Sequence, residues 1–168
     1  IEVRDALGTS RVRNDYDDTG RLIRMTDAAG NEINYAHDEG ANTEIVTDRL
    51  GRQTRFVYDA QGNVLRRERG VTVEGVLVNA VTEFAYDGEG NPTSRSDPDG
   101  KRVVSSYVDR VPVLVSSDPS GLDLVTAYAY DAHRLLTGAV DPAGRSSTFG
   151  YDANGNLTTQ GGFGTYTF

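Results

Sequence analysis

The sequence predicts an all-β protein made of consecutive antiparallel β-hairpins, and three observations carry this prediction. Tyr-Asp pairs recur about every 21 residues, and a second turn signal falls about halfway between them. The segments between the turns are rich in Val, Thr, Tyr, Phe and Ile, which favour strands. No stretch shows convincing helical periodicity. A turn every ten or eleven residues with a short strand between is typical of a β-meander.

The principal repeat is Tyr-Asp-x-x-Gly. Complete copies begin at Tyr16, Tyr58, Tyr86 and Tyr151, and degenerate copies begin at Tyr35, Tyr107 and Tyr130. Successive tyrosines are 19, 23, 28, 21, 23 and 21 residues apart. The predicted structural residues of the motif are Tyr16, Asp17, Gly20, Tyr35, Tyr58, Asp59, Gly62, Tyr86, Asp87, Gly90, Tyr107, Tyr130, Asp131, Tyr151, Asp152 and Gly155.

The second turn signal is Asp-x-x-Gly, often with Pro after the Asp. It begins at Asp27, Asp48, Asp97, Asp118 and Asp141. In both turns the Asp side chain can accept a hydrogen bond from the backbone two residues on, while Gly supplies a positive φ at low cost. Each hairpin is therefore expected to be closed by local chemistry.

Aromatic residues recur two positions apart in the predicted strands, which places both rings of a pair on one face. The pairs are Phe56 and Tyr58, Phe84 and Tyr86, Tyr128 and Tyr130, Phe149 and Tyr151, and Tyr166 and Phe168. We expect these rings to stack from repeat to repeat as a ladder that holds the sheet together. The opposite positions carry Arg55, Arg66, Glu68 and Glu83, which suits a solvated face or a polar lumen.

The repeats fill residues 1–168, which are interpreted as one segment of about seven repeats. The long step from Tyr58 to Tyr86 predicts a longer hairpin inserted near residues 66–83. The turn after Tyr107 is expected to be reshaped, because Val108 precedes Asp109 and no Gly follows. Phe168 stands in mid-repeat, so we interpret the sequence as a segment of a longer chain.

The composition of the chain argues against several classes of partner and kinds of site. The net charge of -8 argues against nucleic acid and anionic membranes as partners, since both require basic patches. The sequence contains no cysteine, which excludes disulfides, thiol nucleophiles and thiolate metal sites. No apolar stretch approaches the roughly 20 residues of a membrane-spanning helix.

Few residues are candidates for catalysis or metal binding. His37 and His133 each follow a Tyr closely and lack the partners of a catalytic triad, so a surface position in a turn is predicted for both. The Asp, Asn and Gly clusters do not match the twelve-residue calcium loop, and they are interpreted as turns. No cofactor or metal site is predicted.

The Tyr-Asp-x-x-Gly motifs are followed by Asn or Arg and an apolar residue such as Leu22, Val64 or Leu157. Alternating with Asp-Pro-x-Gly, they resemble the YD repeats of the Rhs family over essentially the whole chain. The resemblance implies a ribbon of antiparallel strands that spirals into a hollow β-shell around a C-terminal toxin or cargo domain. It also implies a secreted or cell-surface protein, bacterial in origin. The implied partners are the adjacent repeats and the enclosed domain of the same parent chain.

The favoured hypothesis is a non-catalytic wall segment, and two alternatives stay open. One is an extracellular scaffold or adhesin that binds protein or carbohydrate. The other is a self-cleaving core, because the family resemblance implies aspartyl-type cleavage by two Asp residues in successive Asp-Pro-x-Gly motifs. The candidates for that role here are Asp97, Asp118 and Asp141. Since Asp-Pro-x-Gly is also the ordinary turn between repeats, a structural role is favoured for all three.

Overall fold

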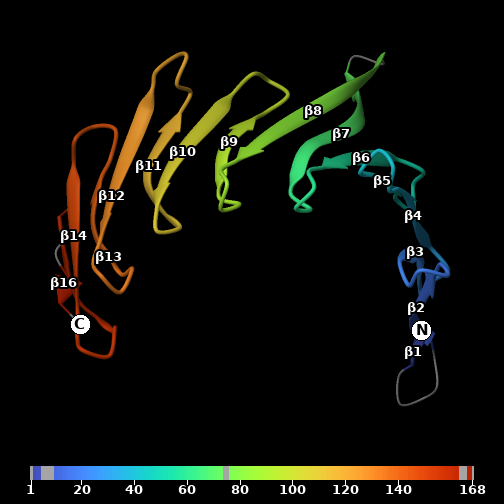
Figure 1. Cartoon of the computed structure of the whole chain (residues 1–168), viewed down its shortest axis with the longest axis horizontal. Coiled ribbons are helices and arrows are strands. Elements are labelled where there is room, and N and C mark those ends of the chain that lie inside the picture. The colour runs from blue at the N-terminus through green and yellow to red at the C-terminus, as the bar shows by residue number, and fades with distance from the viewer. Residues whose placement is uncertain (1, 5–9, 74–75, 163–165, 168) are drawn as a thin grey trace. The chain divides into compact units, whose positions relative to one another are not determined.

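The computed structural model describes residues 2–4, 10–73, 76–162 and 166–167. These residues form strands joined by short turns and contain no helix, which confirms the all-β prediction of consecutive hairpins. The chain divides into two compact units, residues 1–83 and 84–168. Figure 1 shows the strands of each unit following one another in chain order.

In the first unit, each strand pairs antiparallel with its neighbours in sequence, without a crossover among the described residues. The last strand of this unit continues past the boundary at residue 83. The strands are β1 (Glu2–Arg4), β2 (Ser10–Tyr16), β3 (Leu22–Asp27), β4 (Glu32–Asp38), β5 (Thr43–Thr47), β6 (Gln53–Tyr58), β7 (Val64–Val73) and β8 (Val76–Tyr86).

The second unit repeats this arrangement, again with each strand beside its sequence neighbours. Its strands are β9 (Pro92–Ser96), β10 (Arg102–Val108), β11 (Val111–Ser117), β12 (Leu124–Tyr130), β13 (Leu136–Val140), β14 (Ser146–Tyr151), β15 (Leu157–Gly161) and β16 (Tyr166–Thr167).

The long step between Tyr58 and Tyr86 falls on β7 and β8, which have 10 and 11 residues. They pair from Arg66 opposite Glu83 to Val73 opposite Val76. The tip at residues 74–75 lies outside the described residues, as do residues 163–165 and 168 near the C-terminal end.

The sheet has little interior. Among the residues whose burial is described, no hydrophobic side chain is buried, and Thr82, with 2% of its surface exposed, is the one buried residue. Most apolar side chains in the strands are half-buried, and they lie on both faces of the sheet, as Ile45 and Val46 show. Each strand is therefore stabilised by its two neighbours, as in other repeat proteins.

Candidate functional site

The turns have a common hydrogen-bond network, which Asp59 illustrates. One carboxylate oxygen of Asp59 accepts the backbone N–H groups of Gln61 (2.9 Å) and Asn63 (2.8 Å). The Gly62 N–H donates to the Asp59 carbonyl, and Gly62 has a φ of 86°. The Asn63 side-chain amide bonds the second carboxylate oxygen, and this hydrogen bond is the main reason that the pKa of Asp59 lies below its usual value.

The same pattern recurs in turns at both ends of the strands. In each of these turns the Asp carboxylate accepts the N–H groups of the second and fourth residues that follow it. The other Asp residues with this pattern are Asp17, Asp27, Asp48, Asp87, Asp131, Asp141 and Asp152.

The residue after the turn Gly has a role that the sequence argument missed. Its side chain bonds the free oxygen of the turn Asp, through an amide in Asn31, Asn63, Asn91 and Asn156. Arg52 and Arg145 make the equivalent bond with a guanidinium group. The recurrence of Asn or Arg after the turn Gly is the sequence feature from which this role could have been predicted. The hydrogen bond that closes the turn explains why these residue types recur there.

Several turns depart from the full arrangement around Asp59 and Gly62, among them the three that follow. After Tyr107, Asp109 and Arg110 form a two-residue turn in which both residues have positive φ (50° and 67°), so this turn is reshaped as predicted. After Tyr130, Arg134 occupies the Gly position with a φ of 64°. In the Asp118 turn, Asp118 and Asp123 have positive φ while Gly121 does not.

A β-bulge follows the Tyr in five hairpins. In β2 and β3, for example, Tyr16 lies opposite Leu22 and Asp15 opposite Arg24, so Ile23 is the extra residue. The same shift occurs at Tyr58, Tyr107, Tyr130 and Tyr151. The hairpins closed by the other Asp turns have regular register. Because a bulge increases local twist, the two kinds of turn bend the strands differently.

The register corrects the predicted ladder of rings. Tyr16, Tyr58, Tyr130 and Tyr151 each lie opposite an aliphatic residue of the next strand: Leu22, Val64, Leu136 and Leu157. Aromatic pairs occur on alternate strands, about 9.6 Å apart at normal strand spacing. The ring contact that the structure shows joins Phe56 and Tyr58 of one strand, with centroids 6.4 Å apart. In these four hairpins the tyrosine therefore lies opposite an aliphatic residue and not opposite another ring. The side chains of Tyr166 and Phe168 lie outside the described residues.

In two hairpins, the backbone carbonyl of the residue that lies opposite the repeat Tyr is within hydrogen-bond distance of a side chain on the next strand of the sheet. The Tyr151 hydroxyl donates to the Leu136 carbonyl at 2.9 Å. Likewise, His37 Nε2 lies 2.8 Å from the Leu22 carbonyl oxygen, with the same separation of 15 residues. His37 is 21 residues from both Tyr16 and Tyr58. The residue at the Tyr position of the second repeat is thus His37, followed by Asp38, whereas Tyr35 lies two residues earlier on β4, opposite Val46.

His37 also corrects the prediction that both histidines occupy surface turns. It lies on β4 with 19% of its side chain exposed, beside Glu44. Strand alternation puts it on the aromatic face, which spacing from the nearest Tyr did not reveal. His133 lies in a turn with 85% of its side chain exposed, as predicted.

The carboxylates suggested for self-cleavage have other partners. Asp97 accepts three hydrogen bonds from the Arg95 guanidinium at 2.7–2.9 Å. Asp118 accepts the Leu122 N–H at 3.3 Å. Asp141 closes its own turn, and its pKa is lowered mainly by the hydrogen bond from the Arg145 N–H. A catalytic carboxylate pair shares one proton, whereas these groups are bound by N–H donors.

Oppositely charged residues lie across from one another on the face opposite the rings of the first unit. Arg55 is opposite Glu68, and Arg66 is opposite Glu83. Glu68 lies 3.7 Å from Arg55 and 3.1 Å from Arg66. On β2 and β3, Asp15 binds both Arg13 and Arg24. Charged residues at Arg55, Arg66, Glu68 and Glu83 were predicted, and the register brings Glu68 within ion-pair distance of both Arg55 and Arg66.

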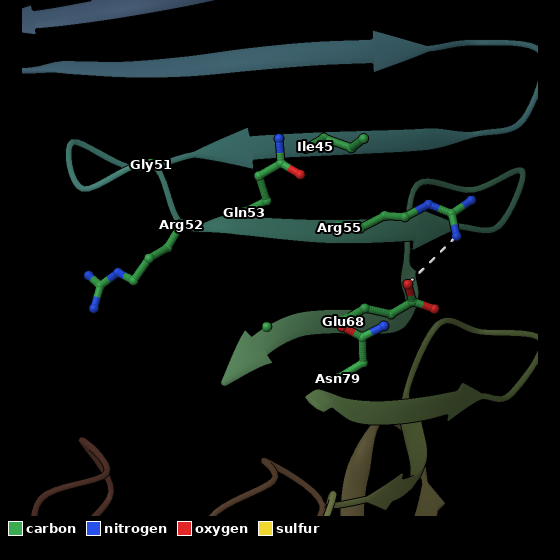
Figure 2. Close-up of a pocket in the computed structure, with 8 residues that line it drawn as sticks. Ile45, Gly51, Arg52, Gln53, Arg55, Glu68 and Asn79 are labelled. Atoms are coloured by element: carbon green, nitrogen blue, oxygen red, sulfur yellow. Dashed lines mark ion pairs between the residues drawn. The ribbon is translucent and has the colours of Figure 1, made fainter. Parts of the chain in front are cut away.

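A pocket of about 470 Å³ opens on this charged face. Figure 2 shows Arg55 reaching toward Glu68, with Ile45 and Gln53 on one side and Asn79 on the other. Arg52, at its rim, is bound to Asp48. The three charged residues that line the pocket, Arg52, Arg55 and Glu68, are therefore each held in an ion pair. In the described part of the chain, no group of three or more His, Cys, Asp or Glu residues is placed to hold a metal ion. That part also holds no helix long and apolar enough to cross a membrane.

The fold is that of a protein built from β-hairpin repeats with Tyr-Asp turns. A family model for the Rhs repeat matches residues 16–40, 43–72 and 133–165, more than half of the chain. The chain belongs to the Rhs repeat family.

Several solved structures share the fold. The crystal structure of TcdB2-TccC3 matches with a TM-score of 0.73 and 16% identity, covering 96% of this chain and 10% of that one. The Tc holotoxin pore of Photorhabdus luminescens, carrying a TccC3 mutation, matches with a TM-score of 0.72 and 18% identity, covering 93% and 9%. At such identity the likeness concerns the fold. The chain spans about a tenth of the length of these proteins.

Proposed function

We propose that this chain is a wall segment of a hollow shell, and that the shell encloses a toxic or other cargo domain of the same parent chain. The observation that carries the proposal is the near absence of an interior among the described residues, where no hydrophobic side chain is buried. A lone sheet of this kind gains stability by joining further repeats rather than by enclosing its own core.

Three further points support the proposal. The chain belongs to the Rhs repeat family. Its fold matches about a tenth of much longer toxin-complex proteins, as a piece of a larger wall would. Its turns are closed by their own hydrogen bonds, which suits a scaffold. We further propose that residues 1–168 act as one repeat segment and that the Tyr, Asp and Gly residues of the motif are structural.

Protection of the enclosed domain against protease tests the proposal. In the parent chain, the domain that follows the repeats should resist digestion while the wall is intact. Replacing Gly62 and Gly155 by Val should disrupt two turns, because both glycines have positive φ (86° and 81°), and should expose that domain. The matched control is Ala60→Val and Ala153→Val in the same two turns. Equal digestion in the native and Gly-substituted chains would contradict encapsulation.

The parent protein is proposed to be secreted or displayed at the cell surface of a bacterium. A secretion or surface-labelling assay on the producing cells tests this location. Retention of the protein in the cytoplasm under conditions in which the cargo acts on other cells would contradict it.

We also infer that the segment has no catalytic role. The hydrogen bonds from Arg95 to Asp97 and from Leu122 to Asp118 support this, because they occupy the candidate carboxylates with donors. On a denaturing gel, the parent chain should show the same fragments with Asp97→Asn and Asp118→Asn as without them. Fragments lost on either substitution would favour the self-cleaving core instead.

A further inference from the structure

His37 connects three strands of the first unit. Its ring is on β4, its Nε2 atom lies 2.8 Å from the Leu22 carbonyl oxygen of β3, and its Nδ1 atom lies 3.0 Å from a carboxylate oxygen of Glu44 on β5. Both side chains are largely shielded, with 19% of His37 and 24% of Glu44 exposed. Each ring nitrogen therefore faces an oxygen that can only accept a hydrogen bond.

This geometry matches the charged form of the ring. An imidazolium donates from both nitrogens, whereas a neutral imidazole donates from one and presents a lone pair at the other. Without the second proton, the ring can serve Leu22 or Glu44 but not both. The remaining nitrogen would then face an oxygen lone pair in a partly shielded site, at a cost comparable to a lost hydrogen bond.

We propose that His37 is a pH-sensitive brace that ties β3, β4 and β5 together in acid and loosens as the pH rises. Histidine is the side chain whose charge ordinarily changes between about pH 5 and 8. The brace is complete while the ring is charged, and it is one hydrogen bond short after the ring loses its proton. Strands β3, β4 and β5 should accordingly be held more tightly while the ring is charged than after it loses its proton.

The other ionisable groups around the ring do not provide the same link. The cleft beside His37, about 400 Å³ in volume, is also lined by Arg21, Asp38, Glu39, Tyr58 and Asp59. Arg21 is paired with Glu39 at 3.0 Å, Asp38 accepts the Ala41 N–H, and Asp59 closes its turn. Burial, followed by the Glu44 charge, raises the pKa of Tyr58, so its hydroxyl stays neutral over the range considered. The open cleft gives water, and hence protons, access to the ring.

The second unit offers an internal reference. There, the Tyr151 hydroxyl donates to the equivalent carbonyl of Leu136, a hydrogen bond that needs no added proton. His133 provides a second reference, because it is mostly exposed and lies 3.9 Å from Asp131. The pH response is thus expected in β3–β5, and it should depend on His37 and not on His133.

Hydrogen–deuterium exchange of the full chain at pH 5.5 and 8.0 tests the brace. Exchange in peptides from β3 to β5 is compared with that of His37→Tyr at the same pH, so that the intrinsic pH effect on exchange cancels. We expect the ratio of native to variant exchange to rise about threefold to tenfold between pH 5.5 and 8.0. His133→Gln should leave that ratio unchanged. An equal ratio at both pH values would overturn the proposal.

Glu44→Gln keeps the test decisive even if His37→Tyr fails to fold. The Gln amide can donate to an unprotonated Nδ1 atom, so the brace no longer needs the second proton. The ratio of His133→Gln to Glu44→Gln exchange in β3–β5 should therefore rise between pH 5.5 and 8.0, because only the His133→Gln chain keeps the pH-dependent brace. A pH response that survives Glu44→Gln would show that Glu44 is not part of the brace and would also overturn the proposal.

Discussion

The two units share their turns but differ on the sheet face opposite the aromatic rings. In the first unit that face carries alternating charges, among them Arg24, Arg55, Arg66 and Glu68, linked by ion pairs. In the second unit, β9 to β15 contain charged residues at Arg95 and Arg102 only, within their described sequences. The corresponding positions of β12–β15 are small or neutral, as in Ala127, Val125, Gly138, Val140, Thr148, Gly150, Thr159 and Gly161.

This difference distinguishes the residues that specify the fold, which both units share, from the residues on the opposite sheet face, which vary between the units. The Asp turns, the bulges and the Tyr-to-aliphatic contacts occur in both units and require neither charged nor small residues on the opposite face. Packing there must still be consistent within each unit, by cross-strand charge pairs in one and by close approach of small residues in the other. The predictions below test this division.

The largest effect is expected from filling the small-residue face. A side chain at Gly150 would collide with the Thr159 hydroxyl on β15, so Gly150→Val should destabilise β14 and β15 by about 2 kcal/mol. The matched change in the first unit is Ala36→Val, at the position before His37. It should have little effect, because Val57 already occupies the equivalent position before Tyr58. Exchange rates of the affected strands measure both changes, and equal losses would abolish the distinction between the faces.

Removing a charge from the first unit should have the next largest effect. Glu68→Gln leaves Arg55 and Arg66 without their shared carboxylate, and should destabilise β6 and β7 by about 1 to 2 kcal/mol. Raising the salt concentration from 0.05 M to about 1 M should likewise weaken the first unit more than the second, since salt screens ion pairs. Local exchange at both salt concentrations provides the measurement. A larger salt effect in the second unit would contradict the role assigned to these pairs.

A smaller effect is expected from replacing Arg134, in a turn of the second unit, by the Gly found at the equivalent position in the first unit. Arg134 has a φ of 64°, a conformation that costs an L-residue energy, whereas Gly62 occupies the same place after Tyr58. Arg134→Gly should stabilise the β12–β13 hairpin by about 0.5 to 1 kcal/mol. Gly62→Arg should destabilise the β6–β7 hairpin correspondingly. Urea unfolding followed by local exchange measures both, and a loss of stability in Arg134→Gly would show that the Arg side chain matters more than its backbone.

The smallest effect per residue is expected from acid, and it should be the same in both units. Hydrogen bonds, first those from Asn63 and Asn156, lower the pKa values of Asp59 and Asp152 in the folded chain below their usual value near 3.9. The turns thus contribute stability above that value, which is lost as the pH falls through the lowered pKa values. Asp59→Asn and Asp152→Asn should each reduce the loss below about pH 4. Acid unfolding curves test this, and a response confined to one unit would contradict a shared turn mechanism.

Much of the fold follows from local sequence chemistry. Asp and Gly at fixed spacing specify where the chain turns, and alternating apolar residues specify strands, so the meander could be predicted without coordinates. The reshaped turn after Tyr107 could also be anticipated, because Gly is missing there. These features depend on residues within a few positions of one another.

The features that were missed depend on register between strands. The bulge in the five hairpins described above decides which residue lies opposite the Tyr, and no residue type in the sequence marks it unambiguously. The place of His37 in the repeat was hidden because Tyr35 offered a better match of residue type, although the 21-residue spacing favoured His37. The ladder prediction failed because it counted aromatic residues along the chain without the strand that separates them.

The described strands pair with their neighbours in sequence, and this has a consequence for biosynthesis. Each new strand finds its partner in the stretch of polypeptide made just before it, so a hairpin can dock as soon as it leaves the ribosome and need not wait for distant residues. The growing edge is in turn covered by the next strand to emerge, which shortens the time during which it is open to other nascent chains. A sheet made in this way is completed in the order in which its message is translated.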